Sequence, residues 1–330
     1  MTGGAPAGFE SAFGAAEHAE RLARFRAFIE RKGIDVAVIA DPANMHWLTG
    51  YDGWSFYVPQ AVVVPVDGPA LWWGRGMDAA GARRTIPTGV AEIMGYDDGH
   101  VHNTGSPATV DLARRLRGLG LGAAIVGVEL DAHYWTARLQ EVLAREMPSA
   151  IFRDVTGAVN RLRAVKSPAE VALMRKAARL VERMHAVIRN VARPGVPKHE
   201  VIAAAVAEGI RGADGVWGDY PAIVPMAPSG PDAAAPHLTW NDAPIPSGAP
   251  TFFEIAGVCR RYHCPQSRTL CFGAVPARYR KAEAAAHAAI EAGLSAARPG
   301  ATAAEVAAAV LAAIRAHGFE KDSRVGYGVG

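Results

Sequence analysis

The sequence contains few cysteines, no long hydrophobic run and no block of charge of one sign. Its three cysteines, Cys259, Cys264 and Cys271, are clustered and lack Cys-x-x-Cys spacing, which argues against a disulfide framework and against a zinc site. No apolar segment has the ~20 residues of a membrane-spanning helix. The first twenty residues also lack the charged start and apolar segment of a secretory signal. These absences predict a cytoplasmic protein without a membrane partner.

The charges are balanced and dispersed along the chain. Lysine and arginine number 35 and the acidic residues 32, which leaves a formal net charge of +3. Nucleic-acid binders usually present a basic stripe, so the sequence predicts no nucleic-acid partner. Hydrophobic residues make up 50% of the 330, enough for a sizeable core, and the length suggests two domains.

The first half alternates helical and strand patterns. This alternation predicts an α/β domain over residues 17–165, preceded by a flexible lead-in at residues 1–16. The helical patterns cover residues 17–32, 44–48 and 108–118, and the strand patterns cover 34–39, 56–66, 70–74 and 124–129.

A capping-box sequence, Ser167-Pro168-Ala169-Glu170, predicts the start of a long amphipathic helix over residues 169–190. We place a second, α+β domain at residues 166–330. Further helices are expected at 198–211, 278–297 and 302–317, and strands at 221–228, 251–257 and 268–272. The chain ends in a glycine-rich approach to a strand without a closing element, which predicts that this domain is incomplete at its C-terminus.

A loop of small residues bounded by prolines, residues 230–240, carries His237. Histidine suits proton transfer near neutral pH, so His237 is a candidate general acid–base. The alternative is a surface histidine in a mobile loop.

Glu254 lies in the apolar segment Thr251-Phe252-Phe253-Glu254-Ile255, which is unusual for a carboxylate because a buried charge must be paired. It is a candidate base, nucleophile or partner of a cation. The alternative is a structural ion pair with one of three nearby arginines: Arg260, Arg261 or Arg268.

Two other groups of residues are candidates for ligand contact. Residues 260–269 combine arginines with His263 and Cys264, and the cysteine is best explained as a small buried residue. In the first half, tryptophans lie beside Asp52, Arg75 and Asp78, a combination that suits a small polar ligand or an interface. The alternative is ordinary packing, since strand alternation requires at least one residue of the pair Trp72-Trp73 to face the core.

The order and spacing of these segments resemble the creatinase and Xaa-Pro aminopeptidase superfamily. The resemblance implies an α/β domain followed by a pita-bread domain, usually in a homodimer. Its metallopeptidase members hold two metal ions with two Asp, one His and two Glu. Here the two Asp positions correspond to Glu254 and Pro265, the His position to Tyr327, and both Glu positions lie beyond Gly330. The resemblance therefore implies a metal-free, creatinase-like hydrolase without a cofactor, in which His237 corresponds to the creatinase histidine.

Within this superfamily, residues 40–58, 72–85, 164–170, 217–242 and 252–269 resemble the ectoine hydrolase family. The resemblance implies opening of the ectoine ring to an N-acetyl-diaminobutyrate, with Glu254 either orienting the amidinium or attacking it, and His237 moving the proton. The other substrate-binding residues expected are Trp54, Ser55, Arg75, Tyr220, Phe252 and His263, the first three supplied by the neighbouring subunit of a homodimer. The alternatives are an Xaa-Pro dipeptidase or aminopeptidase with metal, and a catalytically dead binding module.

Overall fold

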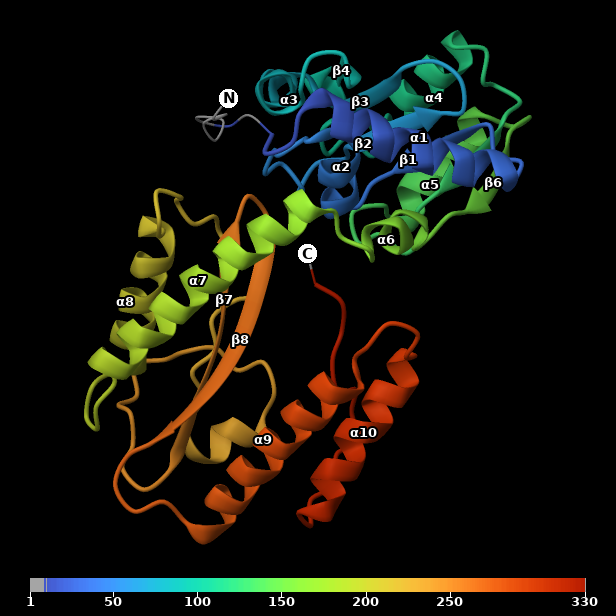
Figure 1. Cartoon of the computed structure of the whole chain (residues 1–330). Helices are drawn as coiled ribbons and strands as arrows, with labels where there is room; N and C mark the ends of the chain where they lie inside the picture. Colours follow the sequence, from blue (N-terminus) through green and yellow to red (C-terminus); the bar gives the residue numbers. More distant parts are fainter. Residues whose placement is uncertain (1–8, 10, 330) are drawn as a thin grey trace. The chain divides into compact units, whose positions relative to one another are not determined.

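The computed structural model describes residue 9 and residues 11–329. The chain forms two compact units, Met1–Val165 and Lys166–Gly330, which are coloured blue to green and green to red in Figure 1. Within the described residues, no helix has both the length and the apolar character needed to cross a bilayer.

The first unit is built on a six-stranded mixed sheet with the order β4-β3-β2-β1-β5-β6. Its strands are β1 (Val36–Ile39), β2 (Ala61–Pro65), β3 (Ala70–Arg75), β4 (Ala91–Tyr96), β5 (Ile125–Val128) and β6 (Ile151–Asp154). β1 is antiparallel to β2 and parallel to β5, so the chain crosses over between the two halves of the sheet.

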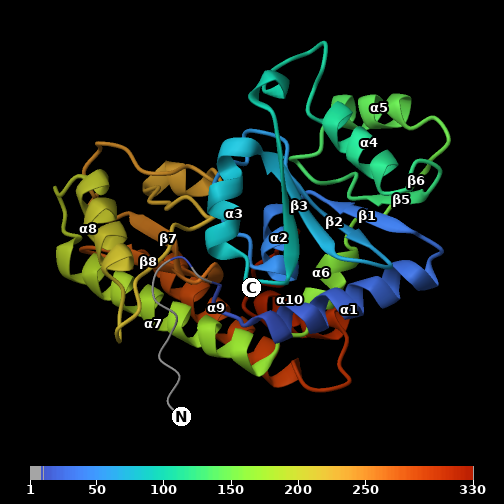
Figure 2. The ribbon, with the colours of Figure 1, turned by 90° about the horizontal axis from the view of Figure 1, so that it is seen from above.

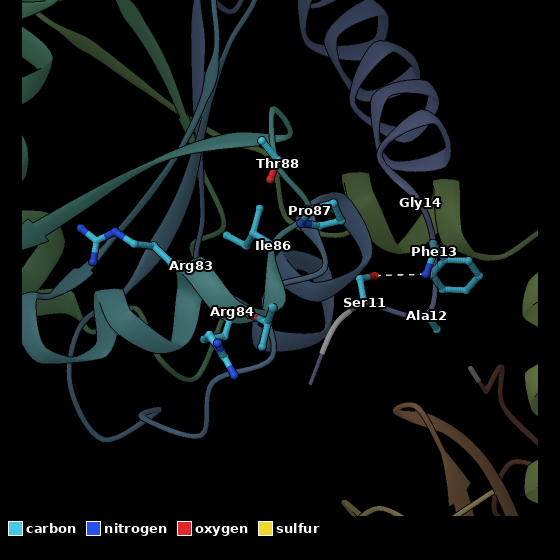
Figure 3. Close-up of a pocket in the computed structure, with 10 residues that line it drawn as sticks. Ser11, Ala12, Phe13, Gly14, Arg83, Arg84, Ile86, Pro87 and Thr88 are labelled. Carbon is cyan, nitrogen blue, oxygen red and sulfur yellow. Dashed lines mark hydrogen bonds between the residues drawn. The ribbon is translucent and has the colours of Figure 1, made fainter. Parts of the chain in front are cut away.

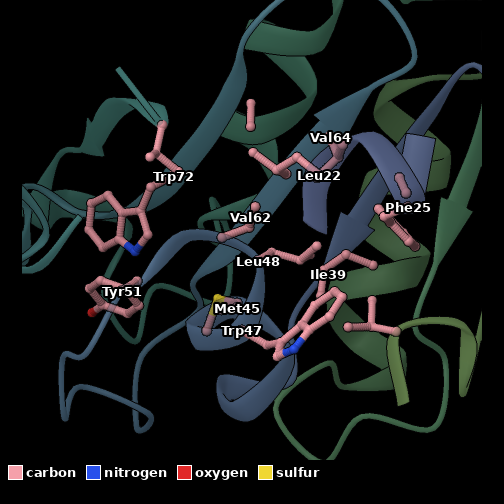
Figure 4. Packing of buried hydrophobic residues seen from close by; sticks show 14 of the residues in the cluster. Leu22, Phe25, Ile39, Met45, Trp47, Leu48, Tyr51, Val62, Val64 and Trp72 are labelled. Carbon is pink, nitrogen blue, oxygen red and sulfur yellow. The ribbon is translucent and has the colours of Figure 1, made fainter. Parts of the chain in front are cut away.

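Helices cover both faces of this sheet (Figure 2). They are α1 (Ala15–Arg31), α2 (Pro42–Thr49), α3 (Ala79–Thr85), α4 (Thr109–Gly118), α5 (Ala137–Glu146) and α6 (Ala158–Arg163). Trp72 packs into the cluster formed with α1 and α2, beside Tyr51 (Figure 4), whereas Trp73 packs into the cluster formed with α4 and α5. Both tryptophans are therefore fully buried, because strand alternation sends neighbouring side chains to opposite, equally covered faces.

Several elements of the first unit differ from the predicted ones. The strand expected at residues 56–66 begins only at Ala61, and α3, α5, β4 and β6 lie in stretches for which no element was expected. β6 exposes Ile151 and most of β4 is only partly buried, whereas α5 buries Leu139, Val142 and Leu143. Residues 1–8 and 10 of the expected lead-in lie outside the described residues. Within the described part of that lead-in, Phe13 is buried and the Ser11 hydroxyl is 2.9 Å from Nε2 of His18.

The second unit packs a long β-hairpin against helices. Its elements are α7 (Pro168–Val191), α8 (Lys198–Arg211), β7 (Pro250–Cys259), β8 (Tyr262–Cys271), α9 (Ala277–Ala296) and α10 (Ala303–Ala316). The predicted capping box is confirmed: Ser167 accepts from the Glu170 N–H, and Glu170 accepts from the Ser167 N–H. Gly257 allows the hairpin to approach α7 closely, because a Cβ at this position would lie 2.2 Å from the Ala177 carbonyl oxygen.

The strand predicted at residues 221–228 is wrong. This segment forms only isolated bridges to the edge of β7, at Met226–Glu254 and at Ser229–Thr251. Three prolines, Pro221, Pro225 and Pro228, remove backbone donors from the segment and prevent a continuous ladder. β8, in contrast, is longer than predicted, since it starts directly after a two-residue turn at Tyr262.

Candidate functional site

The β7–β8 hairpin has one face against α7 and one face turned away from it. Phe253 and Ile255 are buried in the cluster that includes α7 and α8 residues. Glu254 alternates with them and is paired across the hairpin with Ser267, and Phe252 shares its face. Glu254 and Phe252 are half-buried. The hairpin thus presents a carboxylate and an aromatic ring on the face that α7 does not cover.

The three arginines that might have neutralised Glu254 lie elsewhere. Arg268 is paired with Phe253, which places it on the opposite face, and it donates to the Ser267 carbonyl at 2.7 Å. The guanidinium of Arg260 stacks on Trp217 at 4.9 Å, and that of Arg261 stacks on Tyr220 at 3.9 Å. Within the described residues, Glu254 forms no salt bridge, so the alternative of a structural ion pair finds no support there.

His237 follows a short 3₁₀ turn, Gly230–Ala234, and is exposed, with a left-handed φ of 67°. Its loop returns to the edge of β7 through backbone bonds. The Ala227 N–H donates to the Thr239 carbonyl at 3.1 Å, and Met226 and Glu254 exchange N–H···O bonds of 2.9 and 3.2 Å. Backbone pairing therefore brings the loop that carries His237 to the edge of β7 at Glu254, although 17 residues separate the two in sequence.

The segment with Tyr220 is bound to the turn of the hairpin. Tyr220 is 46% exposed, and its ring carries the Arg261 guanidinium described above. Asp219 accepts from the Arg261 backbone N–H at 3.1 Å and from the Trp217 indole at 3.3 Å. Sequence reasoning missed Asp219, and the only available signal was a carboxylate between two aromatic residues.

His263 uses both ring nitrogens on backbone groups. Nε2 lies 2.9 Å from the Ala222 N–H, and Nδ1 lies 2.7 Å from the Arg261 carbonyl oxygen. Burial lowers the pKa of His263 below its usual range. A direct contact between His263 and a substrate stays a prediction.

The remaining candidates, Trp54, Ser55 and Arg75, belong to the first unit, whereas the other five belong to the second. Trp54 is 67% exposed and Ser55 is buried. Arg75 donates two hydrogen bonds of 2.7 Å to the Asp98 carboxylate, which holds the pKa of Asp98 below its usual value and raises the pKa of Arg75. A carboxylate ligand would have to compete with Asp98 for this guanidinium.

A cavity of about 470 Å³ lies in the first unit, between the start of α1 and the end of α3 (Figure 3). It is lined by Ser11, Ala12, Phe13, Gly14, Arg83, Arg84, Thr85, Ile86, Pro87 and Thr88. None of the candidate residues lines it. The cavity and the hairpin surface are therefore separate features of the chain.

Comparisons with known proteins agree with the two-unit organisation. Residues 21–165 match the creatinase/prolidase N-terminal domain, and residues 172–330 match metallopeptidase family M24. An ectoine hydrolase from Halomonas elongata is 46% identical over 279 residues, which cover 82% of this chain and 69% of that protein. An uncharacterized hydrolase/peptidase from Sinorhizobium fredii is 37% identical over 321 residues, covering 96% of this chain and 81% of the relative.

Solved structures show the same fold. A dipeptidase from Mycobacterium ulcerans superposes with a TM-score of 0.77 at 26% identity and covers 96% of this chain and 82% of that one. A prolidase from Thermococcus sibiricus reaches a TM-score of 0.80 at 18% identity, with 95% and 82% covered. The fold prediction, a creatinase-like domain followed by a pita-bread domain, is confirmed. The chain belongs to metallopeptidase family M24 and carries the creatinase/prolidase N-terminal domain.

Proposed function

We propose that this chain is a hydrolase that opens the cyclic amidine ring of ectoine to an N-acetyl-diaminobutyrate without a metal ion. The observation that carries the proposal is the 46% identity to an ectoine hydrolase over 82% of the chain. The half-buried carboxylate of Glu254, on the hairpin face turned away from α7, supplies a group suited to a cationic ring.

The residues at the metal positions of the superfamily do not fit a two-metal site. Pro265 has no side-chain donor and is paired with Ala256 in the hairpin. Tyr327 is a 60% exposed phenol with the Arg324 guanidinium over its ring at 5.3 Å. Among the described residues, no group of three or more His, Cys, Asp and Glu side chains could hold a metal ion. We therefore assign every step to side chains.

Ring opening requires that the amidinium carbon gain an oxygen and lose one nitrogen. In one form of the proposal, Glu254 holds the amidinium N–H groups by charge-assisted bonds while water attacks the carbon. In the other form, the Glu254 carboxylate attacks the carbon, the ring C–N bond breaks, and water then releases the product and regenerates the carboxylate. Both forms consume one water and yield an acetylated amine and a free amine.

The leaving ring nitrogen must gain a proton when its bond to carbon breaks. His237 is the proposed donor, because its loop is tied to the edge of β7 at Glu254 and its imidazole is exposed. General acid–base groups typically contribute about 10²–10⁴-fold to the rate.

Binding of the substrate carboxylate is assigned to Arg75 with Trp54 and Ser55, acting on the site of a neighbouring subunit in a homodimer. Phe252 and Tyr220 are the proposed apolar walls, since each is partly exposed; Phe252 shares the hairpin face of Glu254, and Tyr220 stacks on Arg261 at the hairpin turn. Light scattering on the purified chain tests the homodimer: a monomer mass at assay concentrations would contradict the contribution in trans.

The decisive experiment measures ectoine opening in the presence of a strong chelator. Full activity in chelator supports the metal-independent hydrolase. Loss of activity that manganese or cobalt restores would overturn metal independence while leaving ectoine as the substrate. No opening of ectoine under either condition would overturn the proposed function.

Two variants test the assigned roles. Glu254→Gln and His237→Ala are expected to lower kcat by at least about 10²-fold, with an unchanged circular dichroism spectrum. The matched controls are Glu283→Gln and His287→Ala, because both residues are exposed on α9, and these variants should keep wild-type activity. A near-wild-type rate for either test variant would show that the residue has no such role.

A second candidate function is a dipeptidase or aminopeptidase that acts before proline. The match to family M24 and the dipeptidase and prolidase neighbours favour it. It predicts manganese-dependent hydrolysis of an Ala-Pro dipeptide, and the absence of such hydrolysis while ectoine is opened would exclude it.

A further inference from the structure

We propose that His263 is a positioning residue, which clamps residues 217–222 onto the turn end of the hairpin, where Tyr220 stacks on Arg261, and so fixes the segment that leads to the edge of β7 at Glu254. The inference rests on the proposed function for its catalytic consequence only. The clamp itself follows from contacts within the second unit and has its own measurement.

The hydrogen bonds of the His263 imidazole define its protonation state. A backbone N–H can only donate and a backbone carbonyl can only accept. Nε2 therefore accepts from the Ala222 N–H at 2.9 Å, and Nδ1–H donates to the Arg261 carbonyl at 2.7 Å. The imidazole is neutral, and neither nitrogen can contact a substrate unless one of these bonds breaks.

The clamp lies on the same face of the hairpin as Glu254. His263 is paired with Val258, and the alternate pairs along the ladder are Ala256–Pro265 and Glu254–Ser267, so all three pairs point the same way. Ala256 and Val258 are only 4% and 1% exposed, although α7 packs on the other face. Residues 219–222 bond to this end of the hairpin, at Val258, Arg261 and His263, whereas Glu254, two pairs further along, is only half-buried.

The turn and the segment hold each other in place. Arg260 and Arg261 have left-handed φ values of 51° and 70°, a two-residue turn that normally selects asparagine or glycine. Such a conformation persists in other residues only where the surroundings impose it. Asp219 supplies two of the constraints, because its N–H donates to the Val258 carbonyl at 3.1 Å and its carboxylate accepts from the Arg261 N–H. His263 supplies the third, at Ala222.

Acidification is expected to open this clamp. A protonated imidazole cannot accept from the Ala222 N–H, so the clamp needs the neutral form. Burial lowers the pKa of His263, the neighbouring Arg261 guanidinium acts in the same direction, and Asp219 opposes it. With a folded-state pKa below the usual 6.5, the clamp is intact at neutral pH and is lost as the pH falls through that lowered value.

Three substitutions separate the two hydrogen bonds. His263→Gln places an amide oxygen near the position of Nε2 and keeps an acceptor for Ala222. His263→Asn keeps only a donor near the position of Nδ1, and His263→Ala keeps neither. Hydrogen exchange of the full chain, read on peptides that cover residues 219–224, should be about tenfold faster in the Asn and Ala variants and close to wild type in the Gln variant.

The amides of β7 around Ile255 serve as an internal control, since their protection reports whether the hairpin stays folded. Wild-type exchange at residues 219–224 should accelerate in acid beyond the intrinsic pH dependence, and that of the Gln variant should not. Unchanged protection of residues 219–224 in the Ala variant would overturn the clamp. If His263→Ala also loses protection of the β7 amides, the test is the comparison of His263→Gln with His263→Asn. Equal hydrogen exchange at residues 219–224 in these two variants would overturn the clamp.

Activity supplies the second readout. The Asn variant should raise the KM for ectoine by about tenfold with kcat changed much less, and the Gln variant should restore KM. If His263 instead touched the substrate, the Gln variant would lose affinity while residues 219–224 stayed protected, which would overturn the positioning role. A wild-type chain that never opens ectoine would refute the proposed function, while the exchange experiment would still decide the clamp.

Discussion

Replacing Glu129 by glutamine should change how the stability of the first unit depends on pH. Glu129 follows β5 and is only 3% exposed. Its Oε2 accepts from the N–H groups of Ala40 and Asp41 at 3.0 Å each, and its Oε1 accepts from the Asn44 amide at 2.6 Å. These donors favour the carboxylate, but burial outweighs them and raises the pKa of Glu129 to about 7.

The direction of the effect follows from proton counts. Between the ordinary pKa of 4.5 and about 7, the folded chain holds a proton that the unfolded chain has lost. The free energy of unfolding therefore falls as the pH rises through this range. A difference of about 2.5 pKa units corresponds to about 3 kcal/mol. Glu129→Gln has no titratable group at this position, so its free energy of unfolding lacks this pH-dependent contribution.

The assay is urea unfolding at pH 4.5 and pH 8.0, followed by tryptophan fluorescence, since five of the seven tryptophans lie in the first unit. Glutamine also turns an amide toward the Asn44 amide, but that penalty is the same at both pH values and cancels in the comparison. The stability of the wild type relative to Glu129→Gln should fall by about 3 kcal/mol between the two pH values. Glu92→Gln, at an exposed position of β4, should follow the wild type. Parallel curves for wild type and Glu129→Gln would refute the reasoning.

Two other substitutions test the packing of the hairpin and the ion pair of the first unit. Gly257→Ala should destabilise the second unit by about 3 kcal/mol, because the new Cβ would lie 2.2 Å from the Ala177 carbonyl oxygen. Calorimetry compares this variant with Gly326→Ala, where nothing lies within 4 Å of the new Cβ. Equal unfolding midpoints for the two variants would contradict the prediction. Asp98→Asn should leave the unfolding midpoint nearly unchanged, since the Asp98 side chain of this ion pair is 61% exposed, and should lower the KM for ectoine by freeing the guanidinium. An unchanged or higher KM would show that Arg75 does not bind the substrate carboxylate.

Local sequence signals located many of the elements. The capping box at Ser167 is present as predicted, and the helix expected at residues 302–317 begins with a capping box at Thr302, because a cap depends on residues three positions apart. The paired strands around Glu254 were recognised from their apolar content, although the start of β8 was not. The strand expected at residues 221–228 failed because apolar content was weighed above the three prolines that break the ladder.

The partners of the candidate residues depended on contacts between distant parts of the chain. Glu254 had three arginines within reach in sequence, and only the register of the hairpin places Arg268 on the opposite face. His263 binds Ala222, which is 41 residues away, and Arg75 binds Asp98, 23 residues away. No periodicity in the sequence encodes these distances.

The amino-acid sequence by itself determined the two-part α/β and α+β organisation, the starts of the capped helices α7 and α10, and the family, because periodicity, caps and motif order are properties of neighbouring residues. Only the tertiary structure decided which side chains share the face of Glu254, that the imidazole of His263 is already bonded at both nitrogens, and that a carboxylate occupies the guanidinium of Arg75. The physical reason is that register, burial and hydrogen-bond pairing arise only when segments far apart in the chain are packed together.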